Sequence, residues 1–129
     1  MNPKEYKYTK EHEWVRLEGD VAILGITNFA QEQLGDIVSV EFPKIGKEFS
    51  MGESLALIDS MKTTSEVYAP LTGEVLEVNE ELEGRPELLN EDPYQDGWIL
   101  KLKIKNPEDI ESLMNVEDYE AFIAEEGGT

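Results

Sequence analysis

The sequence predicts a mainly β protein, an antiparallel β-sandwich of barrel-like character with short peripheral helices. The strongest observation is a strict alternation over residues 98–105, where apolar residues and lysines occupy opposite faces. A period of two with one apolar and one polar face is typical of antiparallel sheets. Glycine and proline also recur at short intervals between apolar segments, as turns between short strands require. The face of this strand that we expect to be buried carries Trp98, Leu100, Leu102 and Ile104.

The N-terminal part begins with a hairpin pattern. Residues 14–17 and 21–26 are rich in apolar side chains and flank Glu18-Gly19-Asp20. A glycine at such a corner favours a tight turn, so the two segments are predicted to pair as antiparallel strands.

A short helix is predicted next, near residues 28–34. Asn28 is expected to cap its N-terminus and Gly35 to end it. Residues 37–42 then alternate in the manner of a strand. The face of this strand that we expect to be apolar carries Val38, Val40 and Phe42.

The C-terminal part changes to helical patterns. Near residues 107–113, Asn106 supplies a cap, followed by a proline at the first helical position and acidic residues in the first turn. A second helix is predicted near 116–124, and residues 125–129 are expected to fray. No linker or low-complexity segment interrupts the chain, so a single domain over residues 1–129 is expected. The apolar side chains at helical spacing in the second helix are Tyr119, Phe122 and Ile123.

The composition excludes several function classes. The 129 residues include 29 acidic and 11 basic side chains, a net charge of −18, which argues against nucleic-acid or membrane partners because both bind basic faces. With no cysteine and one histidine, a disulfide framework, a thiolate or histidine-rich metal site and a cysteine nucleophile are excluded. No apolar run approaches the roughly 20 residues that span a bilayer, and the polar N-terminus lacks a secretory signal. We therefore expect a small monomeric protein in the cytoplasm.

Residues 52–79 carry the pattern that points to chemistry. Segments 55–59 and 65–69 are expected to be strands, so the residues between them form a tight hairpin with Lys62 at or beside its tip. A lysine there extends a long, flexible side chain away from the sheet, where a second enzyme can reach it. A lone turn lysine is ordinarily only a solvated polar residue, so the surrounding pattern decides its role.

That pattern resembles the swinging-arm carrier domains, which attach lipoyl or biotin to a lysine. Biotin carriers also place a methionine directly before the lysine, as Met61 does here, so this segment alone leaves the cofactor open. The residues that carry the resemblance are Gly52-Glu53, an apolar strand, Asp59-Ser60-Met61-Lys62, Ala69-Pro70 and Gly73-Glu74-Val75.

The rest of the chain resembles the H proteins of the glycine cleavage system, in register from about Tyr6 to Ala124. Neither biotin carriers nor the lipoyl domains of 2-oxo acid dehydrogenases have the flanking blocks. The chain departs from the family pattern in having Asp, Met and Thr around Lys62 where Glu, Val and Ala are usual, and Glu66 where aspartate is usual. The matching blocks are His12-Glu13-Trp14-Val15, Gly25-Ile26-Thr27-Asn28, Ala30-Gln31, Leu34-Gly35-Asp36-Ile37-Val38, Asn90-Glu91-Asp92-Pro93-Tyr94 and Gly97-Trp98.

The resemblance implies a carrier of the biotinyl/lipoyl fold rather than an enzyme. It implies lipoic acid bound to Lys62 through an amide, which a lipoyl-attaching enzyme would form. In this family the lipoyl arm receives an S-aminomethyl group from the P protein, a glycine decarboxylase, and passes it to the T protein, an aminomethyltransferase. The L protein then reoxidises the arm.

The resemblance also implies a cleft that holds the loaded arm. The two carboxylates expected there suit a cationic methylamine, and the apolar residues suit the lipoyl chain, although simple core packing would also account for the apolar ones. His12 is expected to be structural or exposed rather than catalytic. The expected lining residues are Glu13, Ile26, Ala30, Leu34 and Glu66.

Two other functions fit parts of the sequence. A lipoyl relay protein of the same fold, which donates lipoyl groups to other complexes or serves sulfur oxidation, shares every motif above. Genes for P and T proteins beside this one would separate these two readings. An acid-pair hydrolase is the third possibility, since 29 carboxylates can supply two with different pKa values. No acidic pair stands out from the general excess, which disfavours it.

Overall fold

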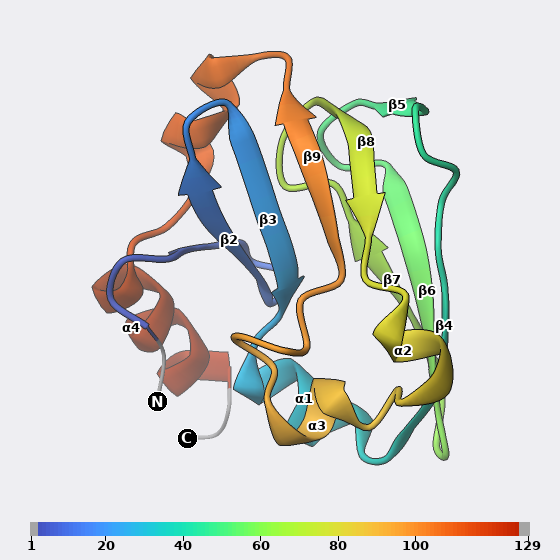
Figure 1. Cartoon of the computed structure of the whole chain (residues 1–129). Coiled ribbons are helices and arrows are strands. Elements are labelled where there is room, and N and C mark those ends of the chain that lie inside the picture. The colour runs from blue at the N-terminus through green and yellow to red at the C-terminus, as the bar shows by residue number, and fades with distance from the viewer. Residues whose placement is uncertain (1–2, 127–129) are drawn as a thin grey trace.

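The computed structural model describes residues 3–126, which form two antiparallel β-sheets packed face to face with helices around them (Figure 1). The predicted fold class is therefore confirmed. The six-stranded sheet has the order β1 (Lys7–Tyr8), β2 (Glu13–Glu18), β3 (Val21–Ile26), β9 (Leu100–Ile104), β8 (Gly73–Val78) and β5 (Glu48–Phe49). The three-stranded sheet has the order β4 (Ile37–Glu41), β6 (Ser54–Ser60) and β7 (Thr64–Tyr68).

The main core lies between the two sheets. Leu24, Leu100 and Leu102 of the larger sheet and Ile58 of the smaller sheet are fully buried in it. Burying side chains of this kind from water is the main favourable contribution to folding. The core thereby fixes how β6 and β7 lie against β2 and β3, on which the site described below depends.

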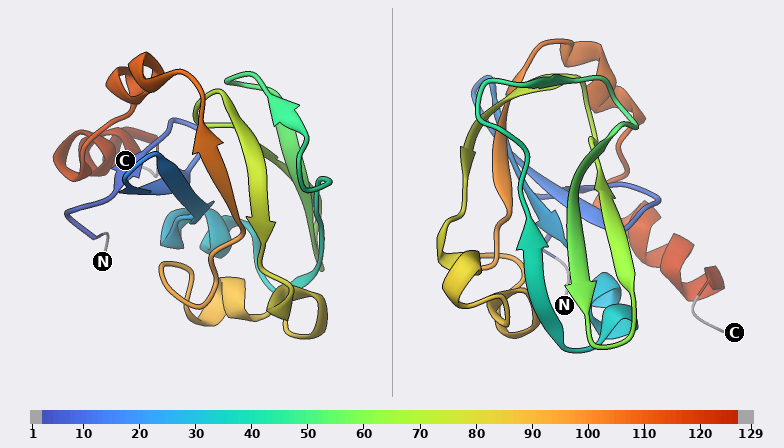
Figure 2. Two further views of the ribbon diagram at one scale, coloured as in Figure 1. Left: turned by 45° about the horizontal axis from the view of Figure 1, so that its top comes forward. Right: turned by 90° about the vertical axis from the view of Figure 1, so that its right-hand side faces the viewer.

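The helices lie at the edges of this sandwich (Figure 2). The predicted helix near 107–113 is a 3-10 helix, and α4 continues two residues past its predicted end. Of the residues expected to fray, 125 and 126 are part of helix α4, and residues 127–129 lie outside the described residues. The helices are α1 (Asn28–Leu34), α2 (Glu81–Gly84), α3 (Leu88–Glu91), the 3-10 helix η1 (Pro107–Ser112) and α4 (Val116–Glu126). None of those in residues 3–126 has the length and apolar character needed to cross a membrane.

Two predicted strand faces need correction. The register of β4 shifts between Ile37 and Ser39, so Val38 turns outward and is 48 % exposed instead of lying on the apolar face. Such a bulge inserts one residue opposite its partner strand and reverses the alternation locally. Trp98 was expected beside Leu100, but β9 begins at Leu100. Trp98 lies in the segment without assigned structure just before β9, and the Lys101 ammonium lies over its ring, 5.1 Å from the centroid.

The predicted cap of α1 also needs correction. Thr27, not Asn28, is the N-cap, and its hydroxyl accepts a hydrogen bond from the backbone N–H of Ala30 (3.3 Å). The extended backbone of Thr27 allows this geometry, and threonine is among the residues preferred as N-caps. Gly35 ends the helix as predicted, with its N–H donating to the carbonyl of Gln31 (3.0 Å).

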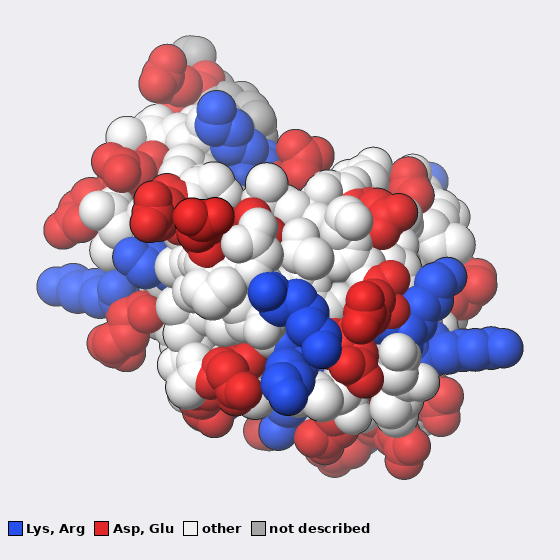
Figure 3. All heavy atoms as spheres, turned by 90° about the horizontal axis from the view of Figure 1, so that it is seen from above, with Lys and Arg blue, Asp and Glu red and all other residues white. Residues whose placement is uncertain are grey.

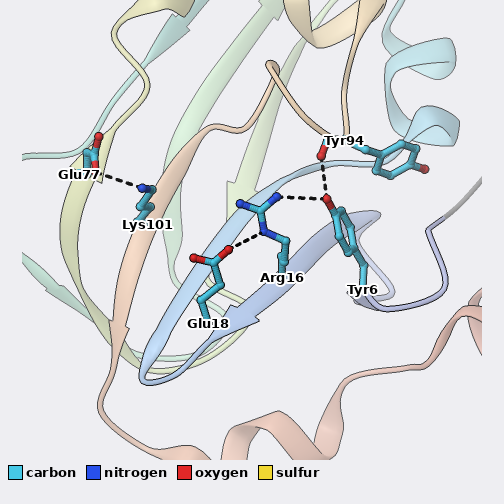
Figure 4. Close-up of polar contacts among 6 residues, drawn as sticks. All are labelled: Tyr6, Arg16, Glu18, Glu77, Tyr94 and Lys101. Carbon is cyan, nitrogen blue, oxygen red and sulfur yellow. Dashed lines mark hydrogen bonds and ion pairs between the residues drawn. The ribbon is translucent and has the colours of Figure 1, made fainter.

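A second apolar cluster joins α4 to the N-terminal strands. Tyr8 of β1 and Tyr119 of α4 are fully buried and stacked, with ring centroids 4.7 Å apart. The Tyr6 hydroxyl donates to the carbonyl of Tyr94 (3.0 Å) and accepts from Arg16 (3.4 Å), as Figure 4 shows. These contacts tie the loop after α3 to β1 and β2, far from it in sequence.

Candidate functional site

Lys62 lies at the tip of the β6–β7 hairpin, at the lower end of the molecule in Figure 1. The last paired residues are Asp59 and Thr64, and the Ser60 N–H donates to the carbonyl of Thr63 (2.8 Å). The Ser60 hydroxyl oxygen accepts from the N–H groups of Lys62 (3.2 Å) and Thr63 (3.1 Å). The turn backbone is therefore fixed by its own hydrogen bonds while the lysine side chain is exposed.

The base of the hairpin is tied to β4. The Asp59 carboxylate accepts hydrogen bonds from the hydroxyls of Thr64 (2.6 Å) and Ser39 (3.0 Å), which lower the pKa of Asp59. The Met61 N–H donates to the carbonyl of Asp36 (2.9 Å). Asp59 thus serves as a local acceptor that two neighbouring strands share, and this holds the tip at a fixed place.

The Lys62 side chain lies over the backbone of Gly35 at the end of α1. A Cβ atom at residue 35 would lie only 2.8 Å from Lys62 Cε. Gly35 also has φ 79° and ψ −154°, a conformation that is essentially restricted to glycine. Gly35 therefore both ends α1 and leaves room for the lysine.

Gly35→Ala is expected to lower the free energy of unfolding by about 1–3 kcal/mol, the usual cost of a residue held in such a conformation. The NMR signal of the Lys62 Cε group should also shift, because the side chain must move away from the new methyl group. Gly46→Ala is the matched control, because Gly46 has φ 94° and open space around it. It should lose stability without moving the Lys62 signal. An unchanged Lys62 signal in Gly35→Ala would contradict the contact.

A cleft of about 120 Å³ lies beside the hairpin, and all five residues expected to hold the arm line it. Strand pairing places Glu13 directly opposite Ile26. Helix α1 adds Ala30 and Leu34, and β7 adds Glu66. His12, Ile58 and Ser65 also line the cleft and were not predicted to do so.

The two walls of the cleft differ in chemistry. Ile26 and Leu34 are buried and Ala30 is half-buried, so one wall is apolar. Ile26 and Leu34 also belong to the main core. These two side chains therefore pack in the core and line the cleft at the same time. Glu66 is exposed at the rim, where it accepts a hydrogen bond from the Tyr68 hydroxyl (3.2 Å) and raises the pKa of Tyr68.

Glu13 is the buried carboxyl group of the site, 2 % exposed. Its Oε1 accepts from the Thr9 hydroxyl (2.7 Å) and its Oε2 from the backbone N–H of Tyr68 (2.8 Å). Burial raises the pKa of Glu13 to about 7; the two hydrogen bonds oppose this shift, and the charge of Glu11 adds to it. A carboxyl group in this state changes its charge near neutral pH and has lone pairs left for another donor.

A larger hollow of about 210 Å³ lies on the other side of Glu13. Its walls come from the segments around Tyr8, Met51, Tyr68 and Met114 rather than from α1. Because Lys62 lies beside the end of α1, the smaller cleft is the one that faces the hairpin tip.

Asn90 holds α1 in place and was missed as a functional residue. Its Oδ1 accepts from the N–H of Ile37 (3.0 Å), and its Nδ2 donates to Gln31 Oε1 and to the carbonyl of Gly35 (both 2.9 Å). The Tyr94 hydroxyl accepts from the N–H of Asn28 at the other end of α1 (2.9 Å). The sequence block from Asn90 to Tyr94 thus positions the helix that carries Ala30 and Leu34.

No group of three or more His, Cys, Asp and Glu side chains suited to a metal ion occurs within residues 3–126. The arrangement instead supplies an exposed amine at a fixed point and, beside it, a cleft with an apolar wall and a buried carboxyl group. An amine in this position can be acylated, and the cleft can hold an apolar chain that ends in a cation.

Comparison with known proteins gives one consistent result. The family model for the glycine cleavage H-protein matches residues 6–126. The glycine cleavage system H protein of Symbiobacterium thermophilum is 50 % identical over 123 residues, 95 % of this chain and 96 % of that protein. That of Xanthobacter autotrophicus is 55 % identical over 117 residues, 91 % and 94 % of the two chains. A crystal structure of the Mycobacterium marinum H protein is similar with a TM-score of 0.86 and 32 % identity, covering 98 % of this chain and all of that one.

Proposed function

Because the chain belongs to the glycine cleavage H-protein family, we propose that it is the lipoyl-lysine carrier of a glycine cleavage system and that Lys62 bears the lipoyl group. The observation that carries this proposal is the exposed lysine at a hydrogen-bonded hairpin tip beside a cleft with one apolar wall and one carboxyl group. The lipoyl group, when bound, supplies the disulfide that takes up and releases the aminomethyl unit.

The dimensions of the chain fit this assignment. An arm of about a dozen bonds from the lysine Cα spans roughly 14 Å. Glu66 lies four residues past Lys62 along the hairpin, and four residues of chain span at most about 14 Å. A folded-back arm therefore reaches the part of the cleft where Glu66 and Glu13 lie.

The residues of the cleft have separate roles in this proposal. Ile26, Ala30 and Leu34 pack against the hydrocarbon part of the arm and keep water from it. Glu13 and Glu66 accept hydrogen bonds from the ammonium group, and such charge-assisted bonds are roughly twice as strong as neutral ones. The chain binds and shields, and cofactors of the partner proteins supply the bond-breaking chemistry.

The proposed partners are the P, T and L proteins of the same system and the enzyme that attaches the lipoyl group. The net charge of −18 favours partner surfaces that are basic near their active-site entrances. Acidic and basic side chains are interspersed on the face that Figure 3 shows, with the acidic ones in excess. On that face, attraction to a basic partner would depend on the overall excess of acidic side chains rather than on one compact acidic patch.

The test is the intact mass and peptide map of protein made in a lipoate-competent cell, followed by reconstitution with purified P protein. We expect one lipoyl group, on the peptide that contains Lys62, and release of CO₂ from glycine that depends on the modified protein. Biotin on Lys62, or lipoyl on another lysine, would contradict the assignment. Lipoylated protein that is inactive with P protein but donates its lipoyl group to other complexes would favour the relay function instead.

A further inference from the structure

His12 has an unusual backbone conformation next to the cleft. Its φ is 70°, in the left-handed region, which is uncommon for any residue other than glycine and is adopted more often by asparagine, aspartate and histidine than by the rest. The following residue is Glu13, the buried carboxyl group of the site. The conformation of His12 therefore decides how β2 begins and where the Glu13 side chain points. Such a conformation persists only where surrounding contacts enforce it.

The enforcing contacts come from β3 and α4. The carbonyl of His12 accepts from the N–H of Thr27 (3.0 Å), which bridges the strands just beyond the Glu13 and Ile26 pair. The Tyr119 hydroxyl lies 2.9 Å from His12 Nδ1 and 2.7 Å from Thr27 Oγ1. Thr27 is also the N-cap of α1. The Tyr119 hydroxyl of α4 thus contacts both His12, which directly precedes β2, and Thr27, which joins β3 to α1.

Tyr119 is itself held rigidly. It is fully buried and stacks on Tyr8, and the His12 ring packs against Phe29 (4.6 Å between centroids) and Phe122 (5.8 Å). Helix α4 lies on the side of the molecule away from the three-stranded sheet (Figure 1). The Tyr119 hydroxyl is connected to the cleft through its contacts with His12 and Thr27. The Tyr119 hydroxyl can therefore influence the cleft indirectly, through His12 and Thr27.

We propose that Tyr119 is a positioning residue of the cleft: through His12 and Thr27, its hydroxyl fixes the backbone that aims Glu13 at the loaded arm. The consequence for the arm rests on the proposed function, whereas the consequence for Glu13 does not. The proposal assigns the C-terminal helix a role in holding the cargo, although no side chain of residues 116–125, the part of α4 whose side chains are described, lines the cleft.

The test is Tyr119→Phe, which keeps the ring and its stacking and removes only the hydroxyl. In protein without any lipoyl group, hydrogen exchange of the Tyr68 amide should quicken about fivefold, the effect of one lost neutral hydrogen bond. This amide donates to Glu13 and so reports how firmly that carboxyl group is held. Amides of β9, between β3 and β8, report global unfolding and serve as the internal reference. In aminomethyl-loaded protein, loss of the amine to water should quicken by a similar factor.

Tyr8→Phe is the matched control. It also removes one hydroxyl from the same stacked pair, but that hydroxyl donates to the carbonyl of Pro3 (2.5 Å). In Tyr8→Phe, hydrogen exchange of the Tyr68 amide, measured relative to the β9 amides, should equal that of the wild type. This should hold even if the variant has a lower melting temperature. Because exchange is measured on unmodified protein, it remains decisive if Lys62 proves not to carry a lipoyl group.

The outcomes separate clearly. Faster relative exchange at Tyr68 in both tyrosine variants, or in neither, would overturn the proposal. If Tyr119→Phe fails to fold, His12→Asn replaces it, since asparagine tolerates the left-handed conformation and removes the ring that meets Tyr119. It should show the same local acceleration, and wild-type exchange in a folded His12→Asn protein would overturn the proposal.

Discussion

Protein with Lys62→Arg is expected to fold like the wild type and to receive no lipoyl group, with complete loss of carrier activity. Arginine cannot form the amide, because its guanidinium stays protonated and is a poor nucleophile. The fold should tolerate the change, since the side chain is exposed and the turn is held by Ser60 and Thr63. Intact mass after expression with lipoate, a melting curve and CO₂ release from glycine with P protein measure the three parts.

Lys44→Arg is the control for Lys62→Arg. Lys44 is also an exposed lysine in a turn, where its carbonyl accepts from the N–H of Lys47 (3.2 Å). Lys44 lies neither in the β6–β7 hairpin nor beside the cleft that Glu13 lines, so its substitution should leave modification and activity unchanged. A lipoyl mass on the Lys62→Arg protein would show that another lysine is the acceptor.

The features predicted well from the sequence are those that short segments determine. The turn at residues 60–63 depends on the two strands beside it and on Ser60, and the structure shows the predicted hairpin. The end of α1 at Gly35 depends on a glycine conformation. In both cases the contacts that decide the structure lie within a few residues along the chain.

The features predicted poorly depend on distant partners. Val38 turns outward because β4 has a bulge against β6, and periodicity within one strand cannot show the register of its neighbour. Thr27 replaces Asn28 as the N-cap of α1, and the N–H of Asn28 is taken by Tyr94, 66 residues away. Nothing in the local sequence distinguishes these two polar residues as caps.

The candidate site divides in the same way. Its five expected lining residues came from resemblance, and the structure brings all of them to one cleft. Their support could not be predicted, because Asn90 and Tyr119 act on α1 and His12 across the fold. Asn90 did stand within a matching block, which was the one signal available.

Glu13→Gln is expected to make the protein more stable at alkaline pH. The pKa of Glu13 is raised in the folded state to about 7 from an ordinary 4.5, so protonation favours folding, and this contribution is lost as the pH rises through 7. The difference corresponds to about 3 kcal/mol. Glutamine does not titrate, so the variant should match the wild type near pH 4.5 and exceed it by about 3 kcal/mol near pH 8. Urea unfolding at both values measures this.

Glutamine also preserves the local hydrogen bonds of Glu13. Its oxygen can accept from the N–H of Tyr68, and its amide can donate to the Thr9 hydroxyl oxygen. If Glu13 served only these local groups, the variant would release the aminomethyl unit at the wild-type rate. This rival interpretation, in which Glu13 only satisfies local hydrogen-bond donors, also predicts a lower melting temperature for the variant.

If Glu13 instead holds the ammonium group, release of the amine to water should quicken in Glu13→Gln by about tenfold, for a loss of about 1.4 kcal/mol of binding. This assumes that release occurs from the undocked arm. Lipoylation and reoxidation by the L protein should be nearly unchanged, because neither step involves the amine. The variant would then be more stable near pH 8 and yet retain its cargo less well, a combination that loss of a merely structural residue does not produce. Time courses of ammonia release from loaded wild type and variant decide the matter, and equal rates would show that Glu13 does not hold the arm.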